Sequence, residues 1–358
     1  MILFIYLLEN NMIPVIVIHT SDFLTDLDSI SYFQTNKINY LLIRRYKLKD
    51  IYSITDYYKN NIKAILISLR YNYDSLYKSR YLINIPTSVS IITFKHTFNE
   101  TIDQLPDFIT QIGLGARFNR FVDQLPIHLT HLTLGSDFNQ TLNNLPSSLR
   151  YLKTGSDFNK SIDQLPTSLA YLELGYHFNQ SIDQLPKSLS SLTLGFEFNQ
   201  SINHLPDSLL RLEITSPYFN QTINQLPISL ICLTLYGLFN QSVGYLPDFL
   251  TDLNLGCDFN QNLDHLPKSL THLLLDSTDF EHSIDKLPKS LTHLHLGYHF
   301  NCAINHLPIG LTHLTIENHI FGYSLAHLPI SLMSLTIQRT FNQSIDHLSK
   351  SIIITRIN

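Results

Sequence analysis

Histidine side chains are the first candidates for chemistry in this sequence, which contains 17 of them among 358 residues. His272, His293 and His313 recur at intervals of about one repeat, and His295 lies two residues after His293. If each interval is one coil, these imidazoles lie on adjacent strands about 5 Å apart. That distance suits a shared metal ion, or coupled titration near neutral pH. The alternative is that duplication copied a Thr-His-Leu segment whose rings are only solvated; the sequence favours it, and no metal or other cofactor is expected.

Asparagine forms a second regular series, because it follows a phenylalanine once in each repeat. Its members are Asn99, Asn119, Asn139, Asn159, Asn179, Asn199, Asn220, Asn240, Asn260, Asn301 and Asn342. Eight of them begin Asn-x-Ser/Thr sequences, the acceptor pattern for glycosylation. The competing interpretation is a ladder in which each side-chain amide satisfies backbone groups of the neighbouring coil. The regular register with phenylalanine favours the ladder.

Cysteine usage and the absence of catalytic motifs limit the functional classes. Cys232, Cys257 and Cys302 form no Cys-x-x-Cys pair, and an odd, irregularly spaced set is a poor disulfide framework. A reducing, intracellular compartment fits this usage. No His-Glu-x-x-His, glycine-rich phosphate loop or nucleophile–base set is present. A catalytic site needs unique residues, whereas the placement of Ser and Asp in this chain follows the repeat. The chain is therefore expected not to be an enzyme.

Charge argues against nucleic acid as a partner, and the short apolar opening argues against a membrane. The net charge is −5; residues 1–84 carry 10 Lys/Arg against 7 Asp/Glu, and residues 85–358 carry 14 against 22. Nucleic acid needs a cationic face, so the acidic portion is not expected to bind it. The apolar opening, residues 1–8, lacks a basic flank and is too short to span a bilayer, so no membrane partner is expected.

The spacing of the phenylalanines shows that the histidines and asparagines above belong to a repeated element. It returns every 20 or 21 residues, thirteen times, and eleven of the thirteen copies are followed by Asn. The positions are Phe98, Phe118, Phe138, Phe158, Phe178, Phe198, Phe219, Phe239, Phe259, Phe280, Phe300, Phe321 and Phe341. Self-similarity at this period predicts a solenoid.

One copy, residues 186–206, predicts the structure of a coil. Its Leu-x-x-Leu-x-Leu run is a strand signature, in which Leu192 and Leu194 share the core face while Ser191 and Thr193 face outward. Gly195 is expected to supply a positive φ where the chain leaves the strand. Three intervals are 21 residues long, and the column glycine is missing in each of them; we expect the longer turn to compensate.

The segment Phe-Asn-Gln-Ser-Ile-Asp-Gln-Leu-Pro, residues 178–186, resembles the FNIP repeat of social amoebae and giant amoeba-infecting viruses. The resemblance covers residues 85–358. It implies a solenoid of leucine-rich-repeat type, a non-catalytic role and, in several relatives, an N-terminal F-box. We therefore expect a parallel β ladder of about 14 regular coils, little helix, and about two degenerate coils before them. The last strand is expected to have an uncapped, open edge.

The first 84 residues differ in composition and are expected to form two segments. Residues 38–84 look like degenerate capping repeats, with strands at 38–43 and 62–67 and a short helix at 47–60. Residues 1–37 contain apolar side chains at helical spacing, namely Leu24, Leu27, Ile30 and Phe33. These fit a capping helix or, alternatively, the remnant of an F-box that docks a Skp1-like adaptor.

The outward strand positions vary while the core does not, which is how a solenoid builds a binding surface. The patch that best suits a protein contact consists of Tyr151, Lys153, Tyr171, Glu173, Arg211 and Glu213. Three functions remain open. The chain is an interaction scaffold for a protein partner, a substrate receptor of a Skp1–cullin-type ubiquitin ligase, or a structural or decoy repeat without a single ligand.

Overall fold

The computed structural model describes residues 3–6, 15–17, 51–52, 85, 90–278, 280–318, 320–341 and 344–357. The chain divides into two compact units, Met1–Gly155 and Ser156–Asn358. The segment boundaries expected at residues 37 and 84 lie outside the described residues, as do the strands expected at 38–43 and 62–67.

Unit 1 contains a short antiparallel pair and a parallel ladder. In the pair, β1 (Leu3–Tyr6) lies against β2 (Val15–Val17). The ladder runs in chain order through β3 (Ile51–Tyr52), β4 (Ile91–Thr93), β5 (Gln111–Gly113), β6 (His131–Thr133) and β7 (Tyr151–Lys153). The expectation of a helix over 47–60 is wrong at residues 51–52, since these pair with β4. Ile and Tyr are β-favouring residues, so this dipeptide suits a strand.

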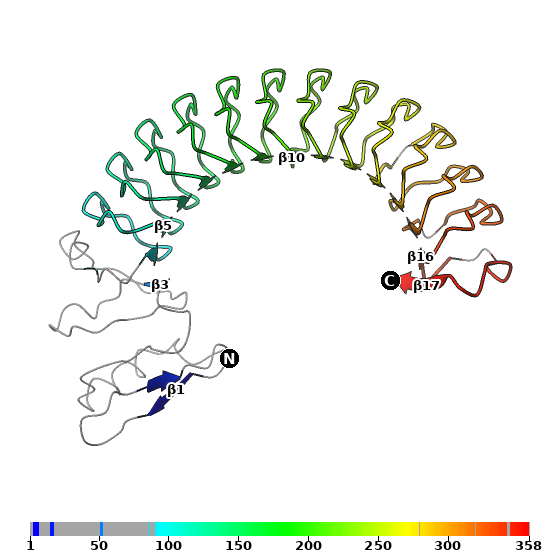
Figure 1. Ribbon diagram of the computed structural model, residues 1–358, viewed down its shortest axis with the longest axis horizontal. Helices are drawn as coiled ribbons and strands as arrows, with labels where there is room; N and C mark the ends of the chain where they lie inside the picture. Colours follow the sequence, from blue (N-terminus) through cyan, green and yellow to red (C-terminus); the bar gives the residue numbers. More distant parts are fainter. Residues whose placement is uncertain are drawn as a thin grey trace. The chain divides into compact units, whose positions relative to one another are not determined.

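Unit 2 continues the same pattern with one strand in each coil. The strands are β8 (Tyr171–Glu173), β9 (Ser191–Leu194), β10 (Arg211–Ile214), β11 (Cys232–Leu235), β12 (Asp252–Leu255), β13 (His272–Leu275), β14 (His293–Leu296), β15 (His313–Ile316), β16 (Ser334–Gln338) and β17 (Ile353–Ile357). All pair in parallel and in chain order. Within this unit the strands line the inner side of the stack and the return segments lie outside (Figure 1). The predicted fold class is confirmed, with β4–β17 as its fourteen regular strands.

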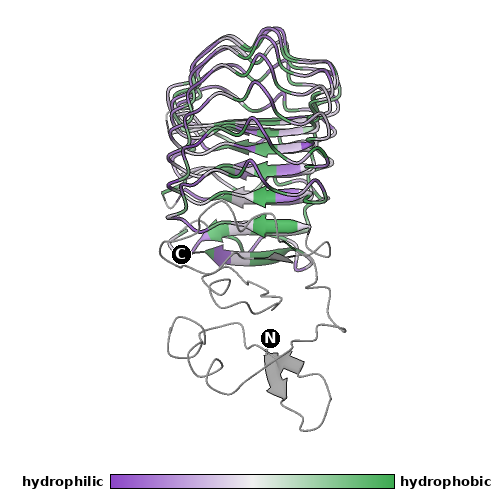
Figure 2. Cartoon of the chain, turned by 90° about the vertical axis from the view of Figure 1, so that its left-hand side faces the viewer, coloured by the Kyte–Doolittle hydropathy of each residue, from purple (hydrophilic) through white to green (hydrophobic). Residues whose placement is uncertain are grey.

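Alternation along each strand sorts core from surface as predicted. On β9, Leu192 and Leu194 are fully buried, whereas Ser191 and Thr193 are half-buried. The register of neighbouring strands is unshifted, so Leu192 lies beside Leu212 and Ser191 beside Arg211. Hydrophobic and polar residues therefore alternate along the stacked strands (Figure 2). The outward side chains form two parallel columns on the strand face.

The phenylalanine column fills the centre of each unit. In unit 2, Phe178, Phe198 and Phe219 are fully buried, and their ring centroids lie 6.3 and 6.1 Å apart in nearly parallel stacks. Burying an aromatic ring in every coil adds a large apolar area to that of the buried Leu and Ile side chains. The stacking of these rings therefore requires one phenylalanine in every coil.

The return segments are successive β-turns. In one coil, the N–H of Leu189 donates to the carbonyl of Pro186 at 3.0 Å, and the N–H of Phe198 donates to Gly195 at 3.3 Å. The described residues contain no helix, so none there could cross a membrane. A coil of 20 residues is closed by turns alone because little chain remains after the strand.

The column glycines do not adopt the left-handed conformation expected of Gly195. Among the described glycines only Gly237 has a positive φ, of 68°. A Cβ on Gly195 would instead lie 2.1 Å from the carbonyl oxygen of Gly175, and one on Gly135 would lie 1.8 Å from that of Gly115. Glycine is required because backbones of successive coils touch at this point.

The 21-residue coils replace that contact with a small buried polar residue. As in other coils of unit 2, the residue after the strand continues the ladder: the N–H of Thr215 donates to Leu194 at 2.9 Å, and that of Gly256 donates to Leu235 at 2.8 Å. In the 21-residue coils the next residue is Ser216, Ser277 or Asn318, each almost fully buried. The extra residue therefore adds a buried Ser or Asn after the strand. Because the column glycines have no positive φ, the predicted exchange of a left-handed glycine for a longer turn does not explain it.

Strand β17 carries a charged residue in register with a core position of β16. Arg356 of β17 stands in register with Ile337, a core position. Its guanidinium donates to the carbonyls of Gln338 and Arg339 at 3.5 and 3.4 Å. The side chain of Arg356 is exposed and bonds back to the coil of β16.

Candidate interaction face

The strand face of unit 2 presents two columns of outward side chains. The first column is Tyr171, Ser191, Arg211, Cys232, Asp252, His272, His293, His313 and Ser334. The second is Glu173, Thr193, Glu213, Thr234, Asn254, Leu274, His295, Thr315 and Thr336. Hydroxyl, carboxylate, imidazole, guanidinium and phenol groups all occur, so the surface is chemically varied on an invariant frame.

The residues of the expected contact patch fall into both units. Tyr151 and Lys153 lie on β7 of unit 1, where Tyr151 stacks on His131 with ring centroids 5.7 Å apart.

In unit 2, Tyr171 and Glu173 lie on β8, and Arg211 and Glu213 lie on β10. Strand β9 separates the two pairs with small side chains, so they are not in direct register. Tyr171 is 52% exposed, and Arg211 is also exposed. The four side chains thus share one accessible face of unit 2.

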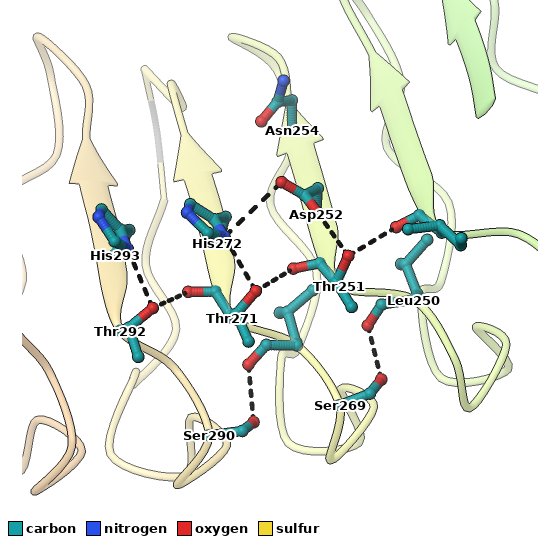
Figure 3. A network of polar contacts seen from close by, with 12 residues as sticks. Leu250, Thr251, Asp252, Asn254, Ser269, Thr271, His272, Ser290, Thr292 and His293 are labelled. Atoms are coloured by element: carbon teal, nitrogen blue, oxygen red, sulfur yellow. Dashed lines mark hydrogen bonds and ion pairs between the residues drawn. The ribbon is translucent and has the colours of Figure 1, made fainter. Parts of the chain in front are cut away.

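The histidines of the first column stack on one another, and His272 and His293 are seen in Figure 3. The ring centroids of His272 and His293 lie 4.3 Å apart, and those of His293 and His313 lie 4.2 Å apart, with interplanar angles of 14° and 7°. This group, the histidine stack, begins beside Asp252, whose Oδ1 lies 3.6 Å from Nδ1 of His272.

Threonines fix the orientation of the stacked rings. The hydroxyl of Thr271 donates to the carbonyl of Thr251 at 3.1 Å and lies 2.9 Å from Nδ1 of His272. Since a hydroxyl has one proton, Nδ1 of His272 must donate to Thr271. Thr292 and Thr312 hold His293 and His313 in the same way. Each ring of the stack is therefore held at Nδ1 by the threonine before it.

Burial and neighbouring charges act on His293, the middle ring of the stack. Burial, and then the neighbouring charges of His272 and His313, lower the pKa of His293 below its ordinary value, while Asp252 acts in the opposite direction. In the described part of the chain, no group of three or more His, Cys, Asp or Glu side chains is placed to hold a metal ion. His295 pairs instead with Glu317, Nε2 to Oε1 at 3.2 Å.

A row of aromatic side chains at the strand ends was not singled out by the sequence reasoning. The rings of Tyr176 and Phe196 stack at 4.5 Å, and Tyr218 meets Phe196 edge-on at 5.6 Å. Tyr236 and Leu238 follow in the next coil and are about half exposed. We call these five residues the aromatic ridge. Their signal was a large apolar residue one to three positions before the core phenylalanine in four successive coils.

The asparagine ladder is present as predicted. Oδ1 of Asn179 accepts the backbone N–H of Asn199 at 3.0 Å and the side-chain amide of Gln200, also at 3.0 Å. The same pair of bonds joins Asn240 to Asn260 and Gln261. Glycosylation of these side chains remains a separate prediction that the geometry does not test.

The three thiols are free and half-buried. Burial is the main cause that raises the pKa of Cys232, Cys257 and Cys302 above the ordinary value of a thiol. The thiol form therefore predominates at neutral pH, which makes these cysteines poor nucleophiles.

The residues of the F-box-like hypothesis, Leu24, Leu27, Ile30 and Phe33, lie outside the described residues.

Comparison with protein families finds the FNIP Repeat model at residues 98–137, 138–177, 178–216, 239–278 and 280–319, more than half of the chain. The chain belongs to the FNIP repeat family. Each FNIP match spans two coils, so the family unit corresponds to a pair of strands, turns and core phenylalanines. No curated protein matches this FNIP chain.

Two solved structures resemble the FNIP solenoid. CroV588 of a giant virus, described as a circular LRR protein, shares 34% sequence identity with a TM-score of 0.62. The match covers 78% of this chain and 51% of CroV588, so the chain spans about half the length of that relative. The internalin InlF of Listeria monocytogenes has 17% identity and a TM-score of 0.54, covering 70% of this chain and 80% of that one. The internalin likeness shows the fold alone.

Proposed function

We propose that this FNIP repeat protein is a non-catalytic scaffold that binds a protein partner through the strand face. The observation that carries the proposal is the contrast between columns: Leu192 and its equivalents are constant and buried, whereas the first outward column changes from Tyr171 to Arg211 to Asp252. Varied side chains held in fixed register give a surface that can be specific for one partner. Leucine-rich-repeat solenoids are commonly used in this way.

Within that face, we assign contact to Tyr171, Glu173, Arg211 and Glu213 in unit 2, and separately to Tyr151 and Lys153 in unit 1. Tyr and Arg are the residues that most often dominate the free energy of binding at protein interfaces. The free, unreactive thiols suit a reducing compartment such as a host cytoplasm. The acidic balance of residues 85–358 argues for protein rather than nucleic acid as the partner.

Affinity capture from amoeba lysate with two matched double variants tests the proposal. Tyr171→Ala with Arg211→Ala alters the strand face. Tyr245→Ala with His204→Ala alters exposed residues of the return segments. A partner lost with the first variant and retained by the second supports the strand face. Equal retention by both variants, or no specific partner for the parent chain, would contradict it.

The ligase-receptor function is the alternative to this scaffold role. It assigns docking of a Skp1-like adaptor to Leu24, Leu27, Ile30 and Phe33, and the capture experiment includes Leu24→Asp to examine it. Adaptor and cullin subunits that are captured by the parent and lost with Leu24→Asp would favour the receptor. Their absence from both captures leaves the strand face as the site of function.

A further inference from the structure

The histidine stack ends at His313, and the next coil continues the column with a small residue. The ring centroids of His293 and His313 lie 4.2 Å apart, so one face of the His313 ring is covered. On the other side, β16 brings Ser334 into register with His313, at the place where β14 and β15 bring a histidine to their neighbours. Among the described residues, His293 is the one ring stacked on His313. The second face of this imidazole is therefore open above Ser334.

Ile353 bounds the far side of this opening. It stands in register with Ser334 on β17, and its side chain is 70% exposed. Neighbouring strands are about 4.8 Å apart, so the side chains of His313 and Ile353 are about 9–10 Å apart. A planar ring needs about 3.5–4 Å on each face for van der Waals contact. The space over Ser334 between these two side chains, which we call the serine slot, therefore has about the width of one aromatic ring.

The first wall of the serine slot is held in place by the fold. The hydroxyl of Thr312 donates to the carbonyl of Thr292 at 3.0 Å and accepts from Nδ1 of His313 at 2.9 Å. Met333 occupies the equivalent position one coil further along, where its N–H donates to the carbonyl of Thr312 at 2.8 Å. The side chain of Met333 is 61% exposed, one residue before Ser334. A ring that is already fixed loses little conformational entropy on binding, and a thioether makes favourable contacts with an aromatic edge.

Neutral groups surround the serine slot, which selects an uncharged occupant. The second outward column beside it consists of threonines that stand in register, namely Thr315, Thr336 and Thr355. On the described strands β15–β17 there is no carboxylate, and Arg356 bonds back to the coil of β16. A guanidinium would therefore find no counter-charge on these strands. An uncharged aromatic ring, in contrast, meets an imidazole on one face and an aliphatic side chain on the other.

We propose that the serine slot binds an uncharged aromatic side chain, tyrosine or tryptophan, of the partner protein. The ring lies between His313 and Ile353 and extends the histidine stack by one member, while its O–H or N–H pairs with a threonine hydroxyl of the second column. The proposal rests on the scaffold function, which it deepens by naming the chemistry of one contact. The acidic balance of residues 85–358 favours this occupant over a nucleobase.

The probe is N-acetyltryptophanamide, titrated against the full chain while the isoleucine methyl groups are followed by NMR. We expect a saturable shift of the Ile353 methyl signal, because the bound ring lies beside it. N-acetylleucinamide, an apolar probe without a planar ring, should bind about three- to tenfold more weakly. His313→Ala removes one wall and should weaken binding of the tryptophan probe by a similar factor. The matched control is His131→Ala, which should leave the affinity unchanged, because His131 is held by Thr130 at 2.8 Å in the same way but lies on β6.

Ser334→Phe tests the slot without removing a wall. The added ring should fill the slot, so that the tryptophan probe no longer shifts the Ile353 methyl signal of a folded chain. The proposal would be overturned by no saturable shift in the parent chain, by equal affinities for the two probes, or by unchanged affinity in His313→Ala or Ser334→Phe. Binding of an oligoadenylate more tightly than the tryptophan probe, lost in Ser334→Phe, would assign the slot to a nucleobase instead.

Lysate capture separates the slot from the scaffold function. A partner lost with Tyr171→Ala and Arg211→Ala but retained by a folded Ser334→Phe chain would end the slot proposal alone. If the parent chain captures no partner, the scaffold proposal fails. Saturable binding of the tryptophan probe that Ser334→Phe abolishes would then still establish the slot as a site for an aromatic ring.

Discussion

The side-chain oxygen of Asn179 accepts the backbone N–H of Asn199, one coil further along the chain, at 3.0 Å. Both residues follow a buried phenylalanine, so the hydrogen bond lies directly beside the stacked rings of Phe178 and Phe198. Each Phe-Asn pair therefore joins its coil to the next by an apolar and a polar contact at once. This coupling explains why the two residues recur together.

Removal of one ladder acceptor should destabilise the solenoid. Asn179→Ala leaves the N–H of Asn199 and the amide of Gln200 without their acceptor, and should lower the free energy of unfolding by about 1–2 kcal/mol. Asn179→Asp keeps a side-chain oxygen at the same place and should lose less. Chemical denaturation of both variants measures the difference. Equal losses would mean that the hydrogen bond to Asn199 does not contribute.

The glycine contact between coils gives a sharper prediction. Gly195→Ala forces a Cβ against the carbonyl of Gly175, so it should cost about 1–3 kcal/mol as the coils separate. Gly322→Ala is the matched control, because the nearest atoms to its Cβ are 4.0 Å away and its φ is ordinary. Thermal unfolding distinguishes the two. A Gly195→Ala protein as stable as the control would show that the backbones need not touch.

Loss of a core ring should cost more than loss of a surface ring. Phe198→Ala removes a fully buried side chain between two stacked neighbours and should lower the free energy of unfolding by about 3–5 kcal/mol. Phe249→Ala removes a ring that is 67% exposed and should change it by less than about 1 kcal/mol. Similar effects of the two substitutions in urea unfolding would contradict the assignment of the core.

The histidine stack predicts a pH dependence of stability. Because the folded pKa of His293 lies below 6.5, its contribution is complete above pH 6.5 and is lost as pH falls through the folded value. The Tm should therefore decrease on acidification from neutral pH, and should decrease less in His293→Gln. Calorimetry at several pH values provides the test. A parent chain whose Tm rises on mild acidification would show that protonation of the stack is favourable.

The sequence was sufficient for the fold because a coil is short and its core residues recur. Leu192, Leu194 and Phe198 could be placed from spacing alone, since alternation and period leave no other common face. The role of Gly195 could not, because the sequence does not show how closely backbones of successive coils approach. Ser216 was missed for the same reason: its burial follows from the extra residue of its coil.

The candidate site was only partly predictable. The outward columns followed from alternation, and the proximity of His272, His293 and His313 followed from their register. The orientation of their rings depends on Thr271 and its equivalents, which bond to the preceding coil and fix Nδ1. The aromatic ridge was missed because Tyr218 belongs to a 21-residue coil and is out of step with Tyr176 and Phe196 in a simple count.

Site-specific photocrosslinking tests the central claim, that a partner binds the strand face, most directly. Benzoylphenylalanine is placed at Ser191, between the coils of Tyr171 and Arg211, or at Tyr245, a return-segment residue that is 72% exposed. After irradiation with the captured partner, the account predicts a covalent adduct from position 191 and none from position 245. An adduct from position 245 alone would contradict it.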